Sequence, residues 1–216
     1  MNKYVVGIAL MILTFWAYAS FLPEDGAEGL QAMLIFVLPI LVFLLVIFIA
    51  YIIETYNKLV SFKVAVEDSW ADIDVQLSLR LDLADNLVNI VKGYANHEHD
   101  TFLEVTQARS NLMNATDVND VAKSSKELND SLKSLFIIAE QYPNLKANDN
   151  FKQLQADFKE IELTIAKYRE LYNDSVKLYN TSCESFPSSI LAKLFNFKTA
   201  YFFTKTGNSV NILSGN

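Results

Sequence analysis

The sequence of 216 residues is poor in the residue types that support reactive sites and sharp turns. It has one cysteine, two histidines, six glycines and four prolines. A lone thiol cannot close an internal disulfide, and no histidine or positioning group is placed to activate Cys183 as a nucleophile. We therefore interpret Cys183 as a small apolar residue on a helix. No stretch matches a P-loop, a dinucleotide-binding glycine fingerprint or a nucleophile elbow. The sequence thus predicts no enzymatic activity.

Basic charge is also scarce. The chain has 18 lysines and arginines against 25 aspartates and glutamates, which gives a net charge of −7. Nucleic-acid binding depends on basic side chains that neutralise phosphates, so no nucleic acid is expected as a partner. The same charge balance argues against a polybasic segment that recognises anionic lipid.

Charge is absent altogether from residues 31–53, QAMLIFVLPILVFLLVIFIAYII. A helix of this length rises far enough to cross a hydrocarbon core about 30 Å thick. The only helix breaker inside it is Pro39, which membrane-spanning helices tolerate. We predict a transmembrane helix over residues 31–53, and we expect the lipid bilayer to be a partner of the protein.

A second apolar run, residues 4–22, precedes this helix and has two interpretations. The triplet Ala17-Tyr18-Ala19 resembles the cleavage site of a signal peptide. However, the run is longer than a usual signal core, and Trp16 and Phe21 near its end resemble an interfacial aromatic belt. These features favour a first transmembrane helix, followed by a short acidic loop.

The distribution of lysines predicts the topology. Lys3 precedes the first apolar run, Lys58 and Lys63 follow the second, and the loop between the runs has neither lysine nor arginine. By the positive-inside rule, both ends of the chain face the cytoplasm. The expected location is the cell membrane, with an integral anchor and a cytoplasmic domain.

From residue 54 the apolar residues follow helical spacing, mostly three or four apart. The first stripe reaches about residue 113. Its members are Leu59, Phe62, Val66, Trp70, Ile73, Leu77, Leu81, Ala84, Leu87, Val91, Tyr94, Phe102, Val105 and Leu112. One very long helix would explain the stripe, and so would two antiparallel helices that reverse near residues 82–85. We favour two helices, because uninterrupted helices of this length are rare in compact domains.

Two more helices are expected, over residues 117–141 and 149–184. Asp117 is a good N-cap for the first of them. Pro143 and Pro187 are expected to end the helices that precede them. The segment YPNLKAND between the two helices is therefore expected to be an ordered loop.

The fold class that follows is all-α: a membrane-anchored, up-and-down four-helix bundle with a coiled-coil-like core. Glycine is scarce and no strand period is visible. The aromatic stretch SSILAKLFNFKTAYFF after the last helix has two interpretations, since it could lie at the membrane interface or pack against the base of the bundle. The expected organisation is an apolar run with its loop over 1–30, a transmembrane helix over 31–53, the bundle over 54–203 and a disordered tail over 204–216.

Trp70, Asp72 and Asp74 form a compact cluster on the first stripe. The two aspartates are two residues apart and lie on different faces of a helix, which argues against a pair of catalytic carboxylates. We expect Trp70 to anchor the core. We expect the acids to be solvated or paired with an arginine such as Arg80.

The segment His-Glu-His-Asp at residues 97–100 invites a metal interpretation. Metal sites on helices use ligands three or four residues apart, and only the first and last residues of this segment have that spacing. Di-iron bundles use Glu-x-x-His, whereas Tyr94 and Asn96 stand three residues before the two histidines. No metal or other cofactor is expected.

Tyrosine–asparagine pairs recur at Tyr56-Asn57, Tyr172-Asn173 and Tyr179-Asn180. A buried amide fixes register or partner choice at a cost in stability. We therefore expect these asparagines to make structural hydrogen bonds rather than to bind a ligand. No catalytic, cofactor-binding or metal residue is predicted. The residues expected to have structural or interaction roles are Tyr56, Asn57, Trp70, Asp74, Arg80, Asn86, Tyr172, Asn173 and Asn180.

Five segments stand in order along the chain: YNKLV from Tyr56, VEDSWADIDVQLSLRLDLADNLVNIVKGYANHEHDTFLEVTQAR from Val66, YPNLKANDNFKQLQ from Tyr142, YRELYNDSVKLYN from Tyr168 and FPSSILAKLFNFK from Phe186. Together they resemble the LemA family of bacterial membrane proteins, from residue 56 to about residue 203. The resemblance implies a membrane-anchored helical bundle with no established enzymatic activity. It also implies relatives that help to form specialised intracellular membranes, and others that accompany membrane proteases.

The sequence departs from the family pattern in two places. Asp85 stands where relatives often have proline, and the apolar run over 4–22 adds a segment before the usual single span. We expect a non-enzymatic scaffold, organiser or adaptor that acts through self-association or by binding another membrane protein. The alternative is a sensor or regulatory subunit, for example of a membrane protease, that binds a ligand or peptide in its bundle.

Overall fold

The computed structural model describes residues 16, 30–95 and 98–204, and within these residues the chain is helical, with no strand. This confirms the all-α prediction. The helices are α2 (Leu30–Lys92), α3 (His99–Met113), α4 (Val118–Ala139), α5 (Pro143–Lys146), α6 (Asp149–Glu184) and α7 (Ser188–Leu194). The predictions for residues 4–22 lie outside the described residues apart from Trp16, and so does the predicted disordered tail apart from Thr204.

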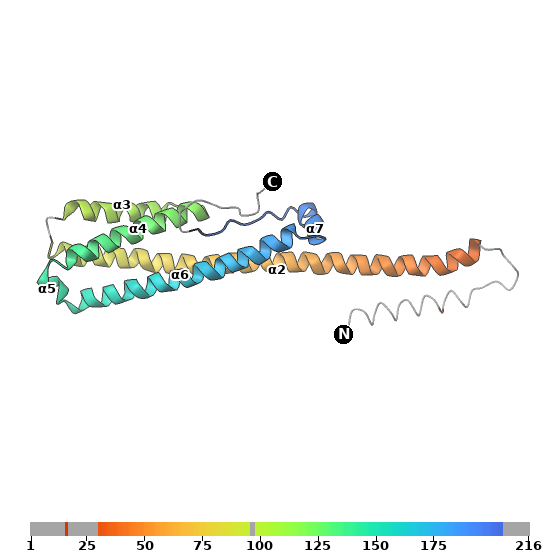
Figure 1. Cartoon of the computed structure of the whole chain (residues 1–216), viewed down its shortest axis with the longest axis horizontal. Coiled ribbons are helices and arrows are strands. Elements are labelled where there is room, and N and C mark those ends of the chain that lie inside the picture. Colours follow the sequence, from red (N-terminus) through yellow and green to blue (C-terminus); the bar gives the residue numbers. More distant parts are fainter. Residues whose placement is uncertain (1–15, 17–29, 96–97, 205–216) are drawn as a thin grey trace.

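The longest element, α2, is a single helix of 63 residues that passes through Pro39 and joins the apolar run to the bundle without a break (Figure 1). The prediction of a reversal near residues 82–85 is wrong. Leu83, Ala84 and Leu87 are all buried there and continue the core stripe, so the helix gains from running on. The helix ends instead at Lys92, a turn follows at Gly93 and Tyr94, and α3 begins at His99. The predicted boundary between span and bundle, at residues 53 and 54, falls inside α2.

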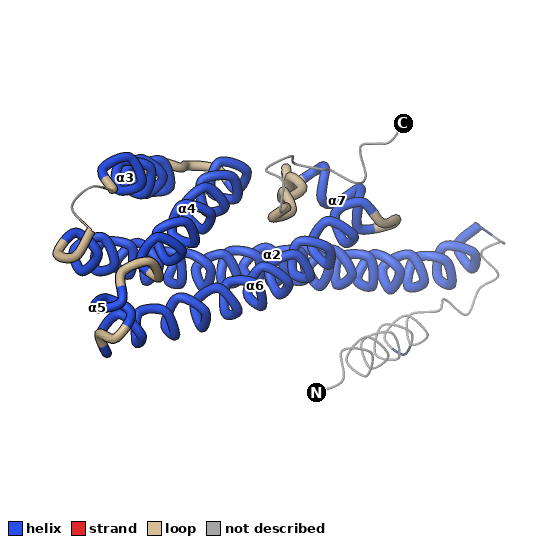
Figure 2. Tube along the Cα trace, turned by 60° about the vertical axis from the view of Figure 1, so that its left-hand side comes forward, coloured by secondary structure: helices blue, strands red, loops and turns tan. Residues whose placement is uncertain are grey.

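Four of the helices form the bundle, and successive helices run in opposite directions (Figures 1 and 2). The main packing partners are α2 with α6 and α3 with α4. The pair α3–α4 is short, with 15 and 22 residues, whereas α6 has 36. Figure 1 shows α3 and α4 covering only the half of the α2–α6 pair that lies farther from the apolar run. The nearer half is covered by α7 and the segment after it.

The core follows a seven-residue repeat, which is typical of supercoiled helices. On α2 the buried positions at this interval are Leu59, Val66, Ile73, Arg80 and Leu87. On α6 they are Phe151, Phe158, Ile165, Tyr172 and Tyr179. The apolar stripes expected over residues 54–113 and on the fourth helix are thus found in the core, except that Tyr94 is exposed. Arg80 is the one charged member of the repeat on α2, in a place where an apolar side chain would be ordinary.

The N-cap predicted at Asp117 is confirmed. Asp117 accepts hydrogen bonds from the backbone N–H groups of Asn119 (2.8 Å) and Asp120 (2.9 Å), as an N-cap should. Asn148 caps α6 in the same way. The loop expected between these helices contains a short helix, because Pro143 occupies the first turn of α5, where its missing N–H costs nothing.

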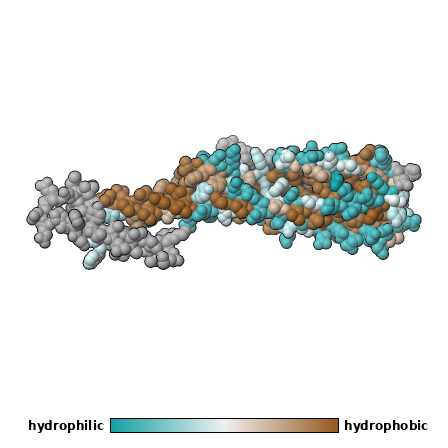
Figure 3. Space-filling model, turned by 180° about the vertical axis from the view of Figure 1, so that it is seen from behind, coloured by the Kyte–Doolittle hydropathy of each residue, from teal (hydrophilic) through white to brown (hydrophobic). Residues whose placement is uncertain are grey.

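The apolar part of α2 does not pack against the bundle. Most side chains from Val37 to Ile53 are exposed, and Figure 3 shows them as one continuous hydrophobic surface that leads away from the domain. Within the described part of the chain, α2 alone has the length and composition to cross a membrane. Such an exposed surface would be unstable in water, and burial in lipid removes that cost.

Candidate functional site

The segment after α7, residues 195–204, turns back along the bundle, and we name it the C-terminal strap. The turn is a Schellman motif: the Phe197 N–H donates to the Ala192 carbonyl (2.9 Å) and the Asn196 N–H donates to the Lys193 carbonyl (3.2 Å). Asn196 has φ of 57°, a left-handed conformation that asparagine adopts more readily than most residues. The strap therefore leaves α7 in a defined direction.

Two asparagines of α6 hold the backbone of the strap. Asn180 accepts a hydrogen bond from the Ala200 N–H (2.8 Å) and donates its amide N–H to the Ala200 carbonyl (2.9 Å). Asn173 forms the same two bonds with Phe203, at 2.8 and 3.1 Å. The Tyr172 hydroxyl adds a third contact, donating to the Tyr201 carbonyl at 2.9 Å. The side chains thus form with the strap the hydrogen bonds that a neighbouring backbone would form with a β-strand.

The spacing of these contacts follows from the geometry of the two elements. Asn173 and Asn180 are seven residues apart, which on a helix is a rise of about 10.5 Å. Ala200 and Phe203 are three residues apart, which in an extended chain is roughly 10 Å. The two asparagine side chains therefore meet matching peptide units. The strap runs antiparallel to α6, and a shift of one residue would break both pairs together.

Aromatic side chains fill the space beneath the strap. The ring of Trp70 lies 5.4 Å from that of Tyr172 and 6.1 Å from that of Phe203, between centroids. Nearer the apolar run, Tyr56 packs edge-on against Phe195 (4.9 Å). Both Trp70 and Tyr56, selected as candidates from the sequence, therefore contact the strap. Burial raises the pKa of Tyr172 to about 12, so its hydroxyl remains a donor at neutral pH.

At the far end of the strap, two arginines meet around one serine. Arg80 of α2 and Arg169 of α6 both donate to the hydroxyl of Ser125 on α4, at 3.4 and 2.9 Å. Arg80 is 2% exposed and Ser125 is fully buried. The guanidinium of Arg169 also lies over the ring of Phe203, 4.4 Å from its centroid. Three helices and the strap therefore converge here.

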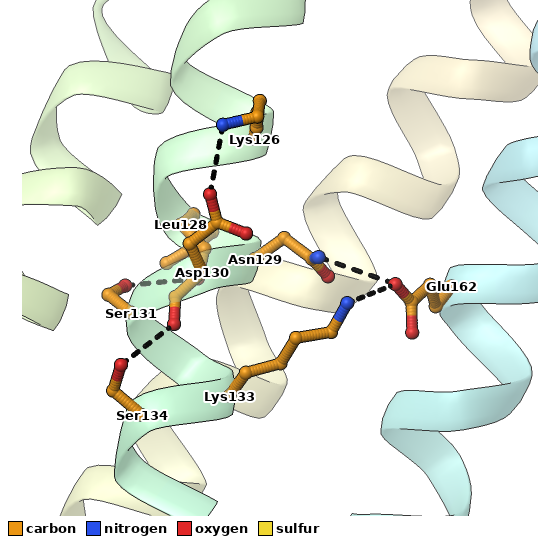
Figure 4. A network of polar contacts seen from close by, with 8 residues as sticks. All are labelled: Lys126, Leu128, Asn129, Asp130, Ser131, Lys133, Ser134 and Glu162. Carbon is orange, nitrogen blue, oxygen red and sulfur yellow. Dashed lines mark hydrogen bonds and ion pairs between the residues drawn. The ribbon is translucent and has the colours of Figure 1, made fainter. Parts of the chain in front are cut away.

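Glu162, the carboxylate whose charge acts on both arginines, is held by other partners. Figure 4 shows Asn129 and Lys133 reaching from α4 to Glu162 of α6, at 3.3 and 2.8 Å. Burial, and next the positive charge of Arg169, lower the pKa of Arg80 to about 10, although Glu162 opposes the shift. Arg80 and Arg169 are thus two neighbouring positive charges, and Glu162 compensates them only at longer range. Sequence reasoning found Arg80 but missed Ser125 and Arg169.

Several residues predicted to have structural roles lie at the surface. Asn57 is exposed, so the buried-amide interpretation fails for this member of the tyrosine–asparagine pairs. Asp74 is also exposed. Of the two alternatives for these acids, the structure shows the solvated one, and Arg80 contacts Ser125 instead. Asn86 is exposed and lines an open groove of about 470 Å³ between α2 and α6.

The remaining reactive residues form no shared site in the described part of the chain. No group of three or more potential metal ligands occurs among the described residues, and His97 lies outside them. His99 is the first residue of α3, and Glu98 accepts a hydrogen bond from the Tyr142 hydroxyl (3.2 Å). Cys183 is buried on α6, and burial raises the pKa of its thiol, so it is mainly neutral at pH 7.

An open groove of about 580 Å³ lies between α3 and α4. Its floor includes Leu103 and Ala108, and its rim carries three acids, Glu104, Glu127 and Asp130.

The fold and this arrangement of contacts define a membrane-anchored all-α bundle. Its C-terminal strap is hydrogen-bonded to the helices of the same bundle. The sequence profile of the LemA family matches residues 69–212, two thirds of the chain. The chain belongs to the LemA family.

Three curated relatives are similar to this chain over about two thirds of its length or more. The chain is 24% identical over 204 residues to magnetosome protein MamQ of Magnetospirillum gryphiswaldense, covering 82% of this chain and 75% of that one. It is 24% identical over 184 residues to magnetosome protein MamQ 2 of Paramagnetospirillum magneticum, covering 73% and 68%. It is 29% identical over 158 residues to protein LemA of Metamycoplasma hominis, covering 67% and 70%.

Proposed function

We propose that this protein is a non-enzymatic scaffold of the bacterial cell membrane that organises its surroundings through self-association or by binding another membrane protein. The observation that carries the proposal is the continuity of α2. One helix of 63 residues forms both the exposed apolar run and the first core helix of the bundle. Contacts made by the domain are therefore coupled mechanically to the span. This is useful for assembly at a membrane, whereas catalysis does not require it.

The outer surface of the domain supports the assembly role. Large apolar side chains are exposed on α3, where Leu103 and Met113 are 54% and 60% exposed. The groove between α3 and α4 adds an apolar floor with an acidic rim. The similarity to proteins named for the magnetosome is in line with an organising role.

In-membrane crosslinking tests this proposal. A photo-crosslinking amino acid is placed at Leu103, and in a matched variant at Asp74, which is exposed on α2. Intact cells are irradiated and adducts are identified by mass spectrometry. We expect adducts with a second copy or with one membrane protein at Leu103, and fewer at Asp74. Monomeric protein at both positions would contradict a scaffold role.

For topology, we propose an integral anchor with the bundle in the cytoplasm. The lysines that follow the span, Lys58 and Lys63, support this orientation. Cys183 is a poor reporter because it is buried. An Ile137→Cys variant in a Cys183→Ala background offers an exposed thiol instead. It should react in intact cells with a membrane-permeant maleimide but not with an impermeant one. Equal reaction with both would place the bundle outside.

A second candidate function is supported by the strap. The bundle already binds an extended peptide segment through its backbone, and this geometry fits a sensor or regulatory subunit that takes a peptide in the same place. The test removes residues 195–216 from the full chain and adds a fluorescent peptide of residues 195–204. We expect the truncated protein to bind it. A peptide with Ala200→Pro should bind far more weakly, because proline lacks the N–H that Asn180 accepts. If a truncated protein with native helicity binds neither peptide, the surface beneath the strap is not a peptide site.

A further inference from the structure

One end of the domain has a concentration of exposed apolar side chains. Phe186, Ile190 and Leu194 are 83%, 60% and 72% exposed. Ile190 and Leu194 are four residues apart and therefore lie on one face of α7, and Phe186 lies in the turn before the helix. The opposite side of α7 packs on the domain, with Leu191 and Ala192 buried. The helix is amphipathic, and its apolar outer face is exposed.

The exposed apolar face of α7 lies close to the point where the apolar run of α2 ends, and this position suggests which partner covers it. Phe195, the C-cap residue of α7, packs against Tyr56, which stands only three residues after the end of the apolar run at Ile53. Three residues of helix correspond to about 4.5 Å. Figures 1 and 2 show α7 lying across α2 rather than along it. If α2 crosses a bilayer, α7 lies along the surface of that bilayer.

Charge points to the same partner. Between Ser185 and Thr204 the chain has two charged residues, Lys193 and Lys198, both of them basic and exposed. The protein as a whole carries −7, so this segment is a local exception. Basic side chains beside an apolar helix face are typical of helices at the interface of anionic membranes. Figure 3 shows hydrophobic surface at the end of the domain that adjoins the span.

We propose that the face of α7 with Ile190 and Leu194, together with Phe186 of the preceding turn, inserts into the headgroup region of the same leaflet from which α2 emerges, with Lys193 and Lys198 facing anionic lipid. The bundle is then attached to the bilayer at two points, the span and α7. This inference rests on the membrane-spanning role of α2 proposed above.

Site-specific fluorescence on the full chain in vesicles tests the proposal. In a Cys183→Ala background, single cysteines at Ile190 and Ile137 carry an environment-sensitive fluorophore. These two isoleucines have similar exposure, 60% and 64%, but Ile137 belongs to α4, near its end farther from the span. A third cysteine, at Leu45, reports on the span.

The vesicles contain phosphatidylcholine with phosphatidylglycerol, and the quenchers are aqueous iodide and lipids with a nitroxide near the headgroup. We expect blue-shifted emission at residue 190, strong quenching by the lipid nitroxide and weak quenching by iodide, with the reverse at residue 137. If residue 45 is shielded from iodide but residue 190 is quenched by iodide as residue 137 is, the inference is wrong and the proposed anchor stands. If residue 45 is open to iodide, the proposed anchor fails as well. Blue-shifted emission at residue 190 without nitroxide quenching would show a protein partner and overturn the inference.

The lysines are tested by a second comparison. Lys193→Gln with Lys198→Gln should lose most of the increase in nitroxide quenching that phosphatidylglycerol gives over phosphatidylcholine alone. The matched control is Lys146→Gln with Lys159→Gln, which removes the same charge from exposed positions in α5 and α6. An equal loss in both double variants would mean that net charge, not the position of α7, governs the effect.

Discussion

The side chain of Asn180 and the peptide unit of Ala200 form two hydrogen bonds with each other, one in each direction. This reciprocal pair fixes the depth and the direction of the C-terminal strap. Asn180 is 1% exposed, so an unpaired amide at this position would be costly.

Replacing Asn180 by alanine should release the middle of the strap. The variant loses two hydrogen bonds and leaves the backbone of Ala200 without them, at a cost of about 1–3 kcal/mol. We expect trypsin cleavage after Lys198 and hydrogen exchange at Ala200 to become roughly tenfold faster, while the melting temperature falls only modestly. Asn57→Ala, at an exposed member of the same kind of pair, should change neither rate. Unchanged cleavage in Asn180→Ala would mean that aromatic packing alone holds the strap.

Placing a charge at Leu77 should unfold the bundle. Leu77 is 4% exposed, and an unpaired carboxylate there costs several kcal/mol. Ile161→Asp should destabilise less, because Ile161 is only partly buried. Leu79→Asp, at a position 46% exposed, is the control and should melt close to the wild type. Circular dichroism of the full-length protein in detergent provides the measurement. Native helicity and an unchanged melting temperature in Leu77→Asp would refute the core assignment.

Replacing Arg80 by methionine should leave stability unchanged or raise it, by up to about 3 kcal/mol. Arg80 is a buried cation that faces Arg169 and has no carboxylate within ion-pair distance among the described residues, and its Nε has no partner there. Arg109→Met is the comparison, because Arg109 forms a half-exposed ion pair with Asp85 at 2.6 Å, and its loss should cost less than about 1 kcal/mol. Denaturant titration measures both. A large loss in Arg80→Met would indicate that the two guanidiniums hold an anion.

Alkaline pH should weaken the bundle through Tyr172. The pKa of this residue is raised from 10.0 to about 12 by burial, so the folded state holds the proton that the unfolded state releases. The associated stability is complete below pH 10 and is lost as pH rises through about 12. Arg80 acts in the opposite sense. Its pKa in the folded state is lowered to about 10, so above this pH the buried guanidinium loses its proton and the cost of burying its charge falls.

The comparison with Tyr172→Phe isolates the tyrosine. At pH 8 the variant should be about 1 kcal/mol less stable, because the hydrogen bond to Tyr201 is lost. Between pH 10 and 12 the difference should shrink, by at most about 1.4 kcal/mol per pH unit. A constant difference across that range would contradict a raised pKa for Tyr172.

Local signals in the sequence predicted most of the helices. The fourth expected helix, residues 149–184, coincides with α6, because a capping asparagine precedes it and Pro187 follows it closely. The acidic residues near 82–85 were misleading. Asp82 and Asp85 are exposed while their neighbours Leu83 and Ala84 are buried, so solvation on one face and packing on the other are both satisfied without a turn.

The strap could not have been predicted from periodicity. Asn173 and Asn180 were identified as register-fixing amides, but their partners lie 20 to 30 residues farther along the chain, in a segment without helical or strand pattern. The only local signal is the match between a seven-residue step on a helix and a three-residue step on an extended chain. Arg169 gave no signal, because an arginine on an amphipathic helix is ordinary on a solvated face.

If α2 crosses a bilayer, as proposed above, its unbroken course makes the domain sensitive to bilayer thickness. A thinner membrane tilts a long apolar helix, and no flexible joint separates this span from the bundle. Roughly 39 residues of the same helix lie beyond the apolar run, so each additional ~10° of tilt carries the far end sideways by about 10 Å. The helix thus converts small differences in lipid thickness into large displacements of the far end of the bundle.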